Sequence, residues 1–322
     1  MTARTPGAPE TRHRMRIVAR TPVATDVVAL DLAAVDGAVL PAWEPGAHVD
    51  LEVEPGTERQ YSLVATTPAG HWRVAVLREA TGRGGSVAVH DSLRVGDEVV
   101  VGGPRNHFGF DPGRPAVFVA GGIGITPISA MITAAEAAGT PWELHYAGRR
   151  RDGMAFAAEL TRAHPERVTL AVADEGARLD VAALLGTPRD AVVYCCGPRG
   201  LTDAVEAAAA HWPVGSVRVE RFAPAADVDA PGAAFTVELA VTGVTLTVPA
   251  DRTVLDVAEE AGAFVLSSCR EGTCGTCETP VLEGSVDHRD TVLSPAEQAD
   301  DRTMMVCVSR ARRGCPRLVL EL

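Results

Sequence analysis

The sequence predicts a multidomain fold with three parts: an antiparallel β-barrel, an α/β domain with a parallel sheet, and an α+β domain of the β-grasp type. Short β-rich runs separated by Gly and Pro occupy the first third of the chain. Unbroken apolar strands then alternate with Ala-rich segments, and four cysteines gather near the C-terminus. A chain of 322 residues with 46% hydrophobic content can bury more core than one domain usually holds.

Charge and cysteine content narrow the class of protein further. A net charge of -12 argues against a nucleic-acid partner, and no apolar run reaches the roughly 18 residues that span a bilayer. The cysteines are odd in number, and the N-terminus lacks the pattern of a signal peptide. We therefore expect a cytoplasmic protein without membrane contact, whose clustered thiols bind metal.

The barrel is expected over residues 13–111, after a disordered tail at 1–12 that holds Pro, Thr and charged residues without periodicity. Alternating or β-rich runs predict its strands at residues 15–19, 27–32, 48–53, 59–64, 72–77 and 98–102. In this part of the chain, only residues 86–93 have the pattern of a short helix.

The parallel-sheet domain is expected over residues 112–223. Apolar strands are predicted at 116–120, 142–147, 168–173 and 191–195, with a last run at 217–222. Their alternation with Ala-rich amphipathic segments is typical of a parallel sheet that has helices on both faces. Residues 224–234 carry Ala-Pro and Pro-Gly steps and scattered Asp, which predicts a linker.

The last domain, expected over residues 235–322, carries the most specific motif. Cys269, Cys274 and Cys277 have the spacing C-x4-C-x2-C, and Cys307 follows at a distance, which is the plant-type [2Fe-2S] ligand pattern. A structural zinc site is the alternative. Zinc ligands usually come as two tight pairs, however, and Cys307 has no paired ligand nearby. The spacing therefore favours a cluster.

The segments around these cysteines predict a β-grasp fold. Residues 234–240 and 245–248 form a hairpin pattern, residues 254–261 a helix and residues 304–308 a strand. Three of the cysteines then come from one loop and the fourth from a distant strand.

Glycines follow the first strand of the predicted parallel sheet. The stretch 121–127 (GGIGITP) leads into a helix that ends before Gly139, where a pyrophosphate can approach the backbone. Its spacing is not G-x-G-x-x-G, so a tight turn without function is the alternative. The stretch 196–198 (CGP) ends a later strand, and the carboxyl ends of neighbouring parallel strands form a ligand crevice. Cys196 is the candidate for nicotinamide contact, whereas Cys195 fits the core.

Charged residues after the second and third of these strands bear on the choice of nucleotide. The second strand is followed by Arg149, Arg150 and Arg151, which could bind the 2′-phosphate of NADPH. The third strand is followed by Asp174 and Glu175, which could bind the free ribose hydroxyl of NADH. Charges at strand ends are most often solvated loop residues. We favour NADH and keep NADPH as the alternative.

The barrel carries a candidate flavin site. Arg59 and Tyr61 share one face of a strand, where the Arg can clamp a phosphate and the Tyr can lie against an isoalloxazine ring. The stretch 82–86 (GRGGS) opens the predicted helix and offers a glycine nest, a helix N-terminus and a hydroxyl. Cross-strand packing is the alternative for Arg59 and Tyr61. The neighbouring nucleotide and cluster motifs favour the flavin.

Together the motifs RQYS, GRGGS, GGIGITP and CGP and the C-terminal cysteines resemble the phthalate dioxygenase reductase family, over about residues 15–322. The resemblance implies one FMN, an NADH site and one [2Fe-2S] cluster in a flavoprotein of electron transport. It implies a Rieske-type aromatic oxygenase or O-demethylase as electron acceptor. The same electron chain serving a cytochrome P450 is the alternative, and a redox sensor without turnover is a third hypothesis.

The resemblance also implies roles for individual residues at matching positions. FMN would contact Arg59, Tyr61, Ser62, Gly84, Gly85 and Ser86, with the backbone of Ala75 and Val76 lining it. The nucleotide would be held by Gly122, Gly124, Thr126, Cys196, Gly197 and Pro198. Thr126, Cys196 and Phe222 are the candidates for the reacting centre, although Phe222 is also compatible with a core position. The family commonly has Lys or Arg where Leu77 stands, so that contact is not carried over.

Overall fold

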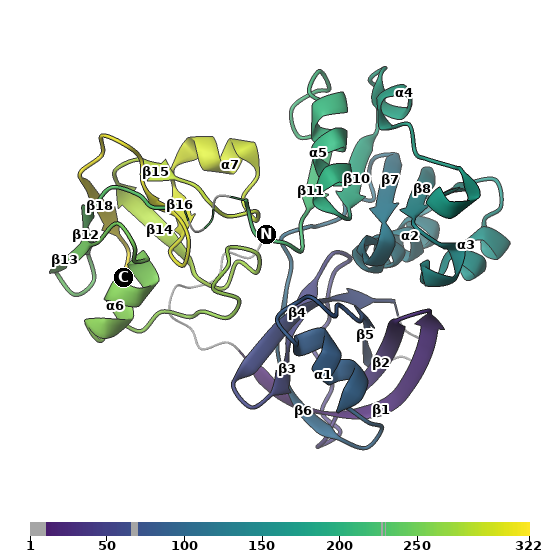
Figure 1. Ribbon diagram of the computed structural model, residues 1–322, viewed down its shortest axis with the longest axis horizontal. Coiled ribbons are helices and arrows are strands. Elements are labelled where there is room, and N and C mark those ends of the chain that lie inside the picture. Colours follow the sequence, from purple (N-terminus) through teal and green to yellow (C-terminus); the bar gives the residue numbers. More distant parts are fainter. Residues whose placement is uncertain (1–10, 66–69, 227, 229) are drawn as a thin grey trace. The chain divides into compact units, whose positions relative to one another are not determined.

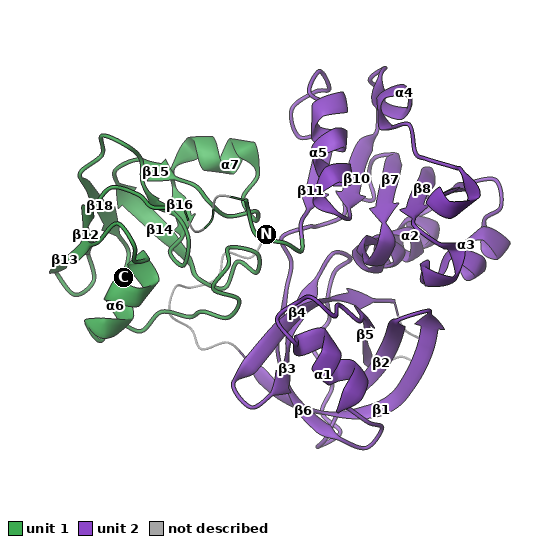
Figure 2. Ribbon diagram, in the orientation of Figure 1, with its two compact units in different colours: residues 1–10, 222–322 green, residues 11–221 purple. Residues whose placement is uncertain are grey.

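The structure is a computed structural model that describes residues 11–65, 70–226, 228 and 230–322 (Figure 1). These residues fall into two compact units, named here in chain order: the first unit, residues 11–221, is purple in Figure 2 (unit 2 in its key), and the second unit, residues 222–322, is green (unit 1 in its key). Residues 1–10 of the predicted tail lie outside the described part. The prediction of a tail to residue 12 is wrong at Arg12. This residue begins the first strand, where it pairs with Gly102 of the neighbouring strand.

The first unit begins with a closed barrel of antiparallel strands in the order β1-β2-β5-β4-β3-β6 (Figure 1). The strands are β1 (Arg12–Ala24), β2 (Val27–Ala34), β3 (His48–Glu54), β4 (Thr57–Val64), β5 (Trp72–Leu77) and β6 (Glu98–Arg105). Leu30, Leu51 and Leu63 are fully buried in its core. Helix α1 (Gly85–Asp91) packs against β3, β4 and β5.

β1 and β6 extend furthest beyond their predicted bounds. β1 pairs with both β6 and β2, and two register shifts in its pairing with β2 let it bend between these neighbours. β6 continues past Gly103 and Pro104 to Arg105, which pairs with His48. The Gly-Pro step marks an irregularity in this strand rather than its end.

The parallel sheet has the order β11-β10-β7-β8-β9. Its strands are β7 (Ala116–Gly121), β8 (Trp142–Gly148), β9 (Val168–Val172), β10 (Val192–Cys196) and β11 (Val217–Glu220). The connections contain η1 (Gly122–Gly124), α2 (Ile125–Ala138), η2 (Arg151–Gly153), α3 (Ala157–Ala163), η3 (Ala173–Glu175), α4 (Val181–Leu185) and α5 (Arg199–Ala208). Buried residues of α2 and α3 pack on one face and those of α4 and α5 on the other. This confirms the predicted α/β architecture.

The order of these strands creates a switch point in the sheet. The chain starts at the central strand β7, proceeds through β8 to β9 at one edge, and then crosses to β10 and β11 on the other side. The loops after β7 and β10 therefore leave the same end of the sheet in opposite directions. Such a crevice is where open α/β sheets bind ligands.

The barrel and the parallel sheet share one hydrophobic cluster within the first unit. Val64 of β4 and Ala75 of β5 belong to the same buried cluster as Ile125 of α2 and Cys196 of β10. Helix α2 contacts β4, and η1 contacts β5. Burial of this apolar surface ties the end of the barrel to the crevice of the sheet.

The second unit contains a mixed sheet in the order β13-β12-β18-β14-β16 and a two-stranded sheet of β15 and β17. Its elements are β12 (Phe235–Leu239), β13 (Val244–Val248), α6 (Val254–Glu260), β14 (Glu278–Glu283), β15 (Val286–Asp287), α7 (Pro295–Asp300), β16 (Thr303–Met305), β17 (Arg310–Ala311) and β18 (Arg317–Leu320). The predicted hairpin and helix are present. The predicted strand at 304–308 ends at Met305, and Cys307 lies in the turn that follows.

The described part of the predicted linker, which lacks residues 227 and 229, contains neither helix nor strand. Across the described residues, no helix is both long and apolar enough to cross a membrane.

Candidate functional site

The four cysteines of the motif come together in the second unit. Cys269, Cys274, Cys277 and Cys307 are between 1% and 6% exposed. The Cys269 thiol contacts the thiols of Cys274 and Cys307, and Cys307 also contacts Cys277. The contacts with Cys274 and Cys307 lower the pKa of Cys269 far below its usual range. Thiols that lie in contact can lose their protons together and bind metal as thiolates.

The loop that carries three of these cysteines is shaped by residues with positive φ. Arg270, Gly272 and Gly275 have φ of 56°, 70° and 71°. The amide of Glu271 donates to Cys269 Sγ at 3.4 Å, and the Thr276 hydroxyl lies 3.1 Å from Cys274 Sγ. Donors around sulfur stabilise the reduced state of an iron–sulfur centre.

The contacts among the four thiols fit a two-iron cluster. In a [2Fe-2S] cluster each iron takes only two of the four thiolates, so a chain of pairwise thiol contacts is the pattern expected. The residues present therefore fit the cluster that the spacing predicts.

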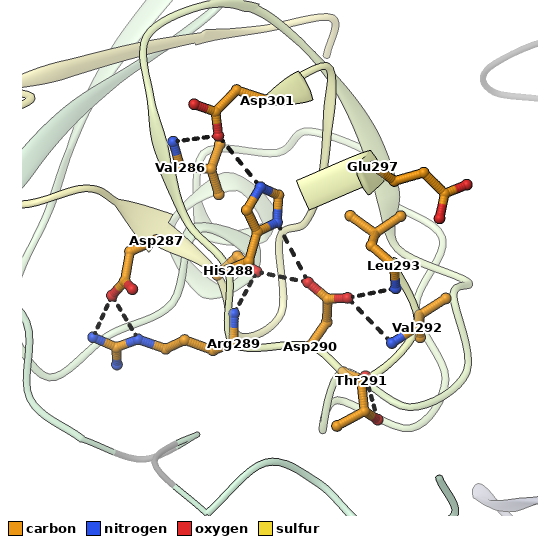
Figure 3. Close-up of polar contacts among 12 residues, drawn as sticks. Val286, Asp287, His288, Arg289, Asp290, Thr291, Val292, Leu293, Glu297 and Asp301 are labelled. Carbon is orange, nitrogen blue, oxygen red and sulfur yellow. Dashed lines mark hydrogen bonds and ion pairs between the residues drawn. The ribbon is translucent and has the colours of Figure 1, made fainter. Parts of the chain in front are cut away.

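A buried polar network supports the cysteine loop from behind, and sequence reasoning missed it. Figure 3 shows His288 between Asp290 and Asp301, with His288 Nδ1 3.5 Å from Asp290 Oδ1 and Nε2 3.3 Å from Asp301 Oδ1. Asp290 accepts from the amide of Leu293 at 2.8 Å and from Ser309 Oγ at 3.4 Å. Its backbone also covers Gly272, where an added Cβ would lie 3.0 Å from Asp290 Cα.

Two candidate flavin residues of the barrel, Arg59 and Gly85, lie in contact. Arg59 of β4 lies across Gly85 at the start of α1, where an added Cβ would be 2.5 Å from Arg59 Cγ. Arg59 Nη2 donates to the Arg83 carbonyl at 3.0 Å. Gly84 precedes the helix with φ of 83°. An arginine beside a glycine turn and a helix start forms a cradle for a phosphate.

Ser62 offers a second observation in favour of a ligand at this end of the barrel. It is 5% exposed, and its Oγ has no hydrogen-bond partner among the described residues. β4 pairs with β5 only at Leu63–Val74 and Val64–Arg73, so the two strands part beside Ser62 and Ala75. A buried hydroxyl without a partner is costly and points to a group that completes it.

The remaining barrel candidates have defined surroundings. Burial raises the pKa of Tyr61 to about 12 despite the nearby Arg59 charge, so the phenol stays protonated. Ser86 Oγ accepts from the Glu79 amide at 3.0 Å and closes the loop before α1. The Val76 carbonyl lies 3.0 Å from His90 Nε2. Leu77 packs against the hydrophobic cluster that the barrel shares with the sheet.

The two loops proposed for the nucleotide touch each other at the switch point. An added Cβ on Gly121 would lie 2.7 Å from Pro198 Cδ, and one on Gly197 would lie 2.9 Å from Gly121 Cα. An added Cβ on Gly124 would overlap the Cys196 carbonyl. Gly121, Gly124 and Gly197 are thus needed for the loops to pack. Gly122, by contrast, has φ of 53° and open space around it.

Thr126 caps its own loop rather than pointing freely into the crevice. Its Oγ1 donates to the Ile123 carbonyl at 2.9 Å, and the residue is 2% exposed. Its hydroxyl shapes the turn before α2.

Cys196 faces the partly buried carboxyl group of Glu220, which the sequence did not single out. Cys196 Sγ lies 3.7 Å from Glu220 Oε2 across the paired strands β10 and β11. Burial raises the pKa of Glu220 to about 8, and burial together with Glu220 raises that of Cys196. Both side chains are therefore neutral at neutral pH. Cys195, by contrast, belongs to the core on the opposite face, as expected.

The other predicted residues are placed as follows. Phe222 follows the end of β11 and is 47% exposed, so it is not a core residue. Arg150 pairs with Asp152 at 2.7 Å, and Arg151 pairs with Glu175 at 2.6 Å.

Comparison with known proteins agrees with these features. The 2Fe-2S iron-sulfur cluster binding domain family matches residues 237–312. The toluene-4-sulfonate monooxygenase system reductase subunit of Comamonas testosteroni is 44% identical, over 93% of this chain and 96% of that protein. The solved structure of phthalate dioxygenase reductase is 37% identical with a TM-score of 0.69, over 97% of this chain and 98% of that one.

A longer protein also contains this module. An intact type IV self-sufficient cytochrome P450 monooxygenase is 42% identical with a TM-score of 0.89; the match covers 97% of this chain but 41% of that one.

The fold and the comparisons define the chain as an oxidoreductase with a C-terminal plant-type ferredoxin domain. It belongs to the phthalate dioxygenase reductase family, as its motifs predicted.

Proposed function

We propose that the chain is the NADH-dependent reductase of a Rieske-type aromatic oxygenase or O-demethylase. FMN would lie at the end of the barrel, NADH at the crevice of the parallel sheet, and a [2Fe-2S] cluster in the C-terminal domain. The observation that carries the proposal is the contact between η1 and β5. It brings the glycine loop proposed for the nucleotide next to the strand proposed to line the flavin.

This adjacency matters because hydride transfer needs its two reacting atoms about 3–3.5 Å apart. A nicotinamide gives two electrons together as a hydride, whereas a [2Fe-2S] cluster accepts one at a time, so a bound flavin supplies the conversion between them. The chain contributes binding and alignment. Arg59 and Gly85 would hold the flavin phosphate, and Ser62 would bond the ring system.

The neutral pair of Cys196 and Glu220 would form the floor of the nicotinamide site. An uncharged thiol offers a small polarisable surface rather than a nucleophile. Thr126 and Phe222 remain candidates near the reacting centre. We propose NADH rather than NADPH, since Arg150 and Arg151 already pair with Asp152 and Glu175.

The acceptor follows from the relatives, several of which are reductase subunits of oxygenase systems, including the phthalate 4,5-dioxygenase and toluene-4-sulfonate monooxygenase systems. A second candidate is a cytochrome P450 acceptor, because a self-sufficient P450 monooxygenase contains this module. A cytoplasmic location is part of the proposal, because clustered cysteines that bind metal are typical of a reducing compartment.

Reconstitution tests the proposal. The purified protein, NADH and a Rieske-type oxygenase with its aromatic substrate should give product in step with NADH oxidation. A parallel reaction with a P450 as acceptor should give little product. Efficient product formation with the P450 as acceptor, and none with the Rieske-type oxygenase, would favour the second candidate.

A further inference from the structure

Two arginines, Arg310 buried and Arg289 mostly buried, join the end of the linker to the C-terminal domain. Arg289 follows β15, and its side chain is 10% exposed. Arg310 begins β17 and is 5% exposed. Both donate hydrogen bonds to linker carbonyls: Arg289 Nη1 to Ala230 and Arg310 Nη2 to Ala233, the latter at 3.3 Å.

Arg310 reaches three segments of the domain at once. It donates to the carbonyls of Ala233, Pro249 (2.7 Å) and Arg252, and its guanidinium lies 5.2 Å from the centre of the Phe235 ring. Gly232 packs so closely against it that an added Cβ would overlap Arg310 Nε. A buried guanidinium is costly when its donors lack partners, and these carbonyls accept from Nη1 and Nη2 of Arg310, whereas Nε has no hydrogen-bond partner among the described residues. The convergence of the carbonyls on Nη1 and Nη2 fixes the path of the chain.

Arg289 connects this region to the cluster loop. Its side chain turns to Asp287, with Nε–Oδ2 at 3.0 Å, on the other side from Asp290 (Figure 3). Its backbone amide donates to Ser309 Oγ at 3.2 Å, and the same Ser309 Oγ donates to Asp290. The next residue but one, Thr291, donates its amide to the Gly272 carbonyl at 2.9 Å. One short segment therefore touches both the linker and the loop that carries the cysteines.

We infer that Arg289 and Arg310 are positioning residues for electron transfer to the cluster. They hold residues 230–233 against the C-terminal domain. A displacement of this end of the linker would therefore move residues 289–291, which support Gly272. We call the two arginines the linker anchor. The inference rests on the proposed electron chain, because it concerns how the cluster is presented to the flavin.

Two variants test the linker anchor in the full-length protein loaded with FMN and cluster. Arg289→Gln removes the charge and the bond to Ala230. Gly232→Ala keeps every charged group but displaces Arg310, so it carries the test if Arg289→Gln fails to fold. Arg313→Gln is the matched control, because Arg313 is exposed and loses the same charge nearby.

The first readout does not depend on activity. The Gly232 amide donates to the Ala250 carbonyl at 3.2 Å, so hydrogen exchange of a peptide spanning residues 230–235 reports on the anchor. We expect exchange about tenfold faster in both variants, equivalent to about 1.4 kcal/mol of local stability, and unchanged in the control. Exchange at the wild-type rate in both variants would overturn the anchor.

The second readout is anaerobic stopped-flow reduction by NADH. Flavin reduction and the spectrum of the reduced cluster should match wild type in both variants, while cluster reduction becomes slower and loses its single-exponential course. Faster exchange combined with wild-type cluster reduction would overturn the positioning role. Failure of NADH to reduce the wild-type flavin would instead contradict the proposed function. The hydrogen exchange of residues 230–235 would still decide whether the linker anchor exists.

Discussion

Cys196 Sγ lies 3.7 Å from Glu220 Oε2, between adjacent parallel strands at the point where the chain forms its crevice. Cys196 is fully buried, and burial raises the pKa of Glu220 to about 8. Glu220 is partly buried, and desolvation of its carboxyl group favours the protonated form beside Cys196.

The raised pKa of Glu220 makes the stability of the first unit depend on pH. Between the ordinary value of 4.5 and about 8, the folded chain holds a proton that the unfolded chain has lost, so stability falls as pH rises through this window. Glu220→Gln removes this titration. We expect it to unfold like wild type at pH 5 and to be more stable by on the order of a few kcal/mol at pH 8.5.

Thermal unfolding at several pH values measures this difference, with flavin fluorescence reporting on the first unit. Glu166→Gln, at an exposed glutamate, is the control and should follow wild type. If the unfolding temperatures of wild type and Glu220→Gln depend on pH in the same way, the pKa of Glu220 is not raised in the folded protein.

Ser62→Ala separates ligand binding from fold stability. Because the Ser62 hydroxyl has no partner among the described residues, its removal should leave the flavin-free protein as stable as wild type, or more stable by about 1 kcal/mol. The flavin dissociation constant should rise roughly tenfold, as expected for one lost hydrogen bond. Titration of the flavin-free protein with FMN measures it. Unchanged affinity would show that this hydroxyl does not face the flavin.

Gly85→Ala tests the phosphate cradle without removing its charge. The added Cβ would lie 2.5 Å from Arg59 Cγ, so Arg59 must move away from the start of α1. Purified Gly85→Ala should therefore lack flavin but keep the absorption of the cluster. Gly82→Ala is the control, since its Cβ would meet Glu79 at 3.4 Å, and it should keep flavin. Stoichiometric flavin in Gly85→Ala would contradict the role of Arg59.

The cysteines outside and inside the motif should behave differently. Cys307→Ser removes one of the four converging thiols and should lose the [2Fe-2S] spectrum while flavin is retained. Cys315 is half-exposed, and its thiol donates to the Arg317 carbonyl at 3.1 Å, so Cys315→Ser should keep the cluster. Iron and sulfide analysis with absorption spectra tests both. Loss of the cluster in Cys315→Ser would mean that the ligand set has been misassigned.

Much of the fold could be predicted from the local sequence, because strand alternation, glycine turns and cysteine spacing depend only on residues that are close together in the chain. Arg59, Gly85 and the four cysteines could be found in this way. Glu220 could not, since only the parallel pairing of β10 and β11 shows that it lies against Cys196. The packing role of Gly124 likewise depends on a loop distant in the sequence.

The supporting network of the cysteine loop was hidden for a similar reason. His288 and Asp290 stand in a polar stretch that reads as a surface loop. Only the folded chain shows that Asp290 is buried beneath Gly272 and hydrogen-bonded by Ser309.

The most direct test of the electron chain is an anaerobic titration of the purified protein with NADH, following flavin and cluster absorption together. The account predicts that near-stoichiometric NADH bleaches both the flavin band and the iron–sulfur bands. Bleaching of the flavin while the cluster stays oxidised, or no bleaching of either, would contradict it.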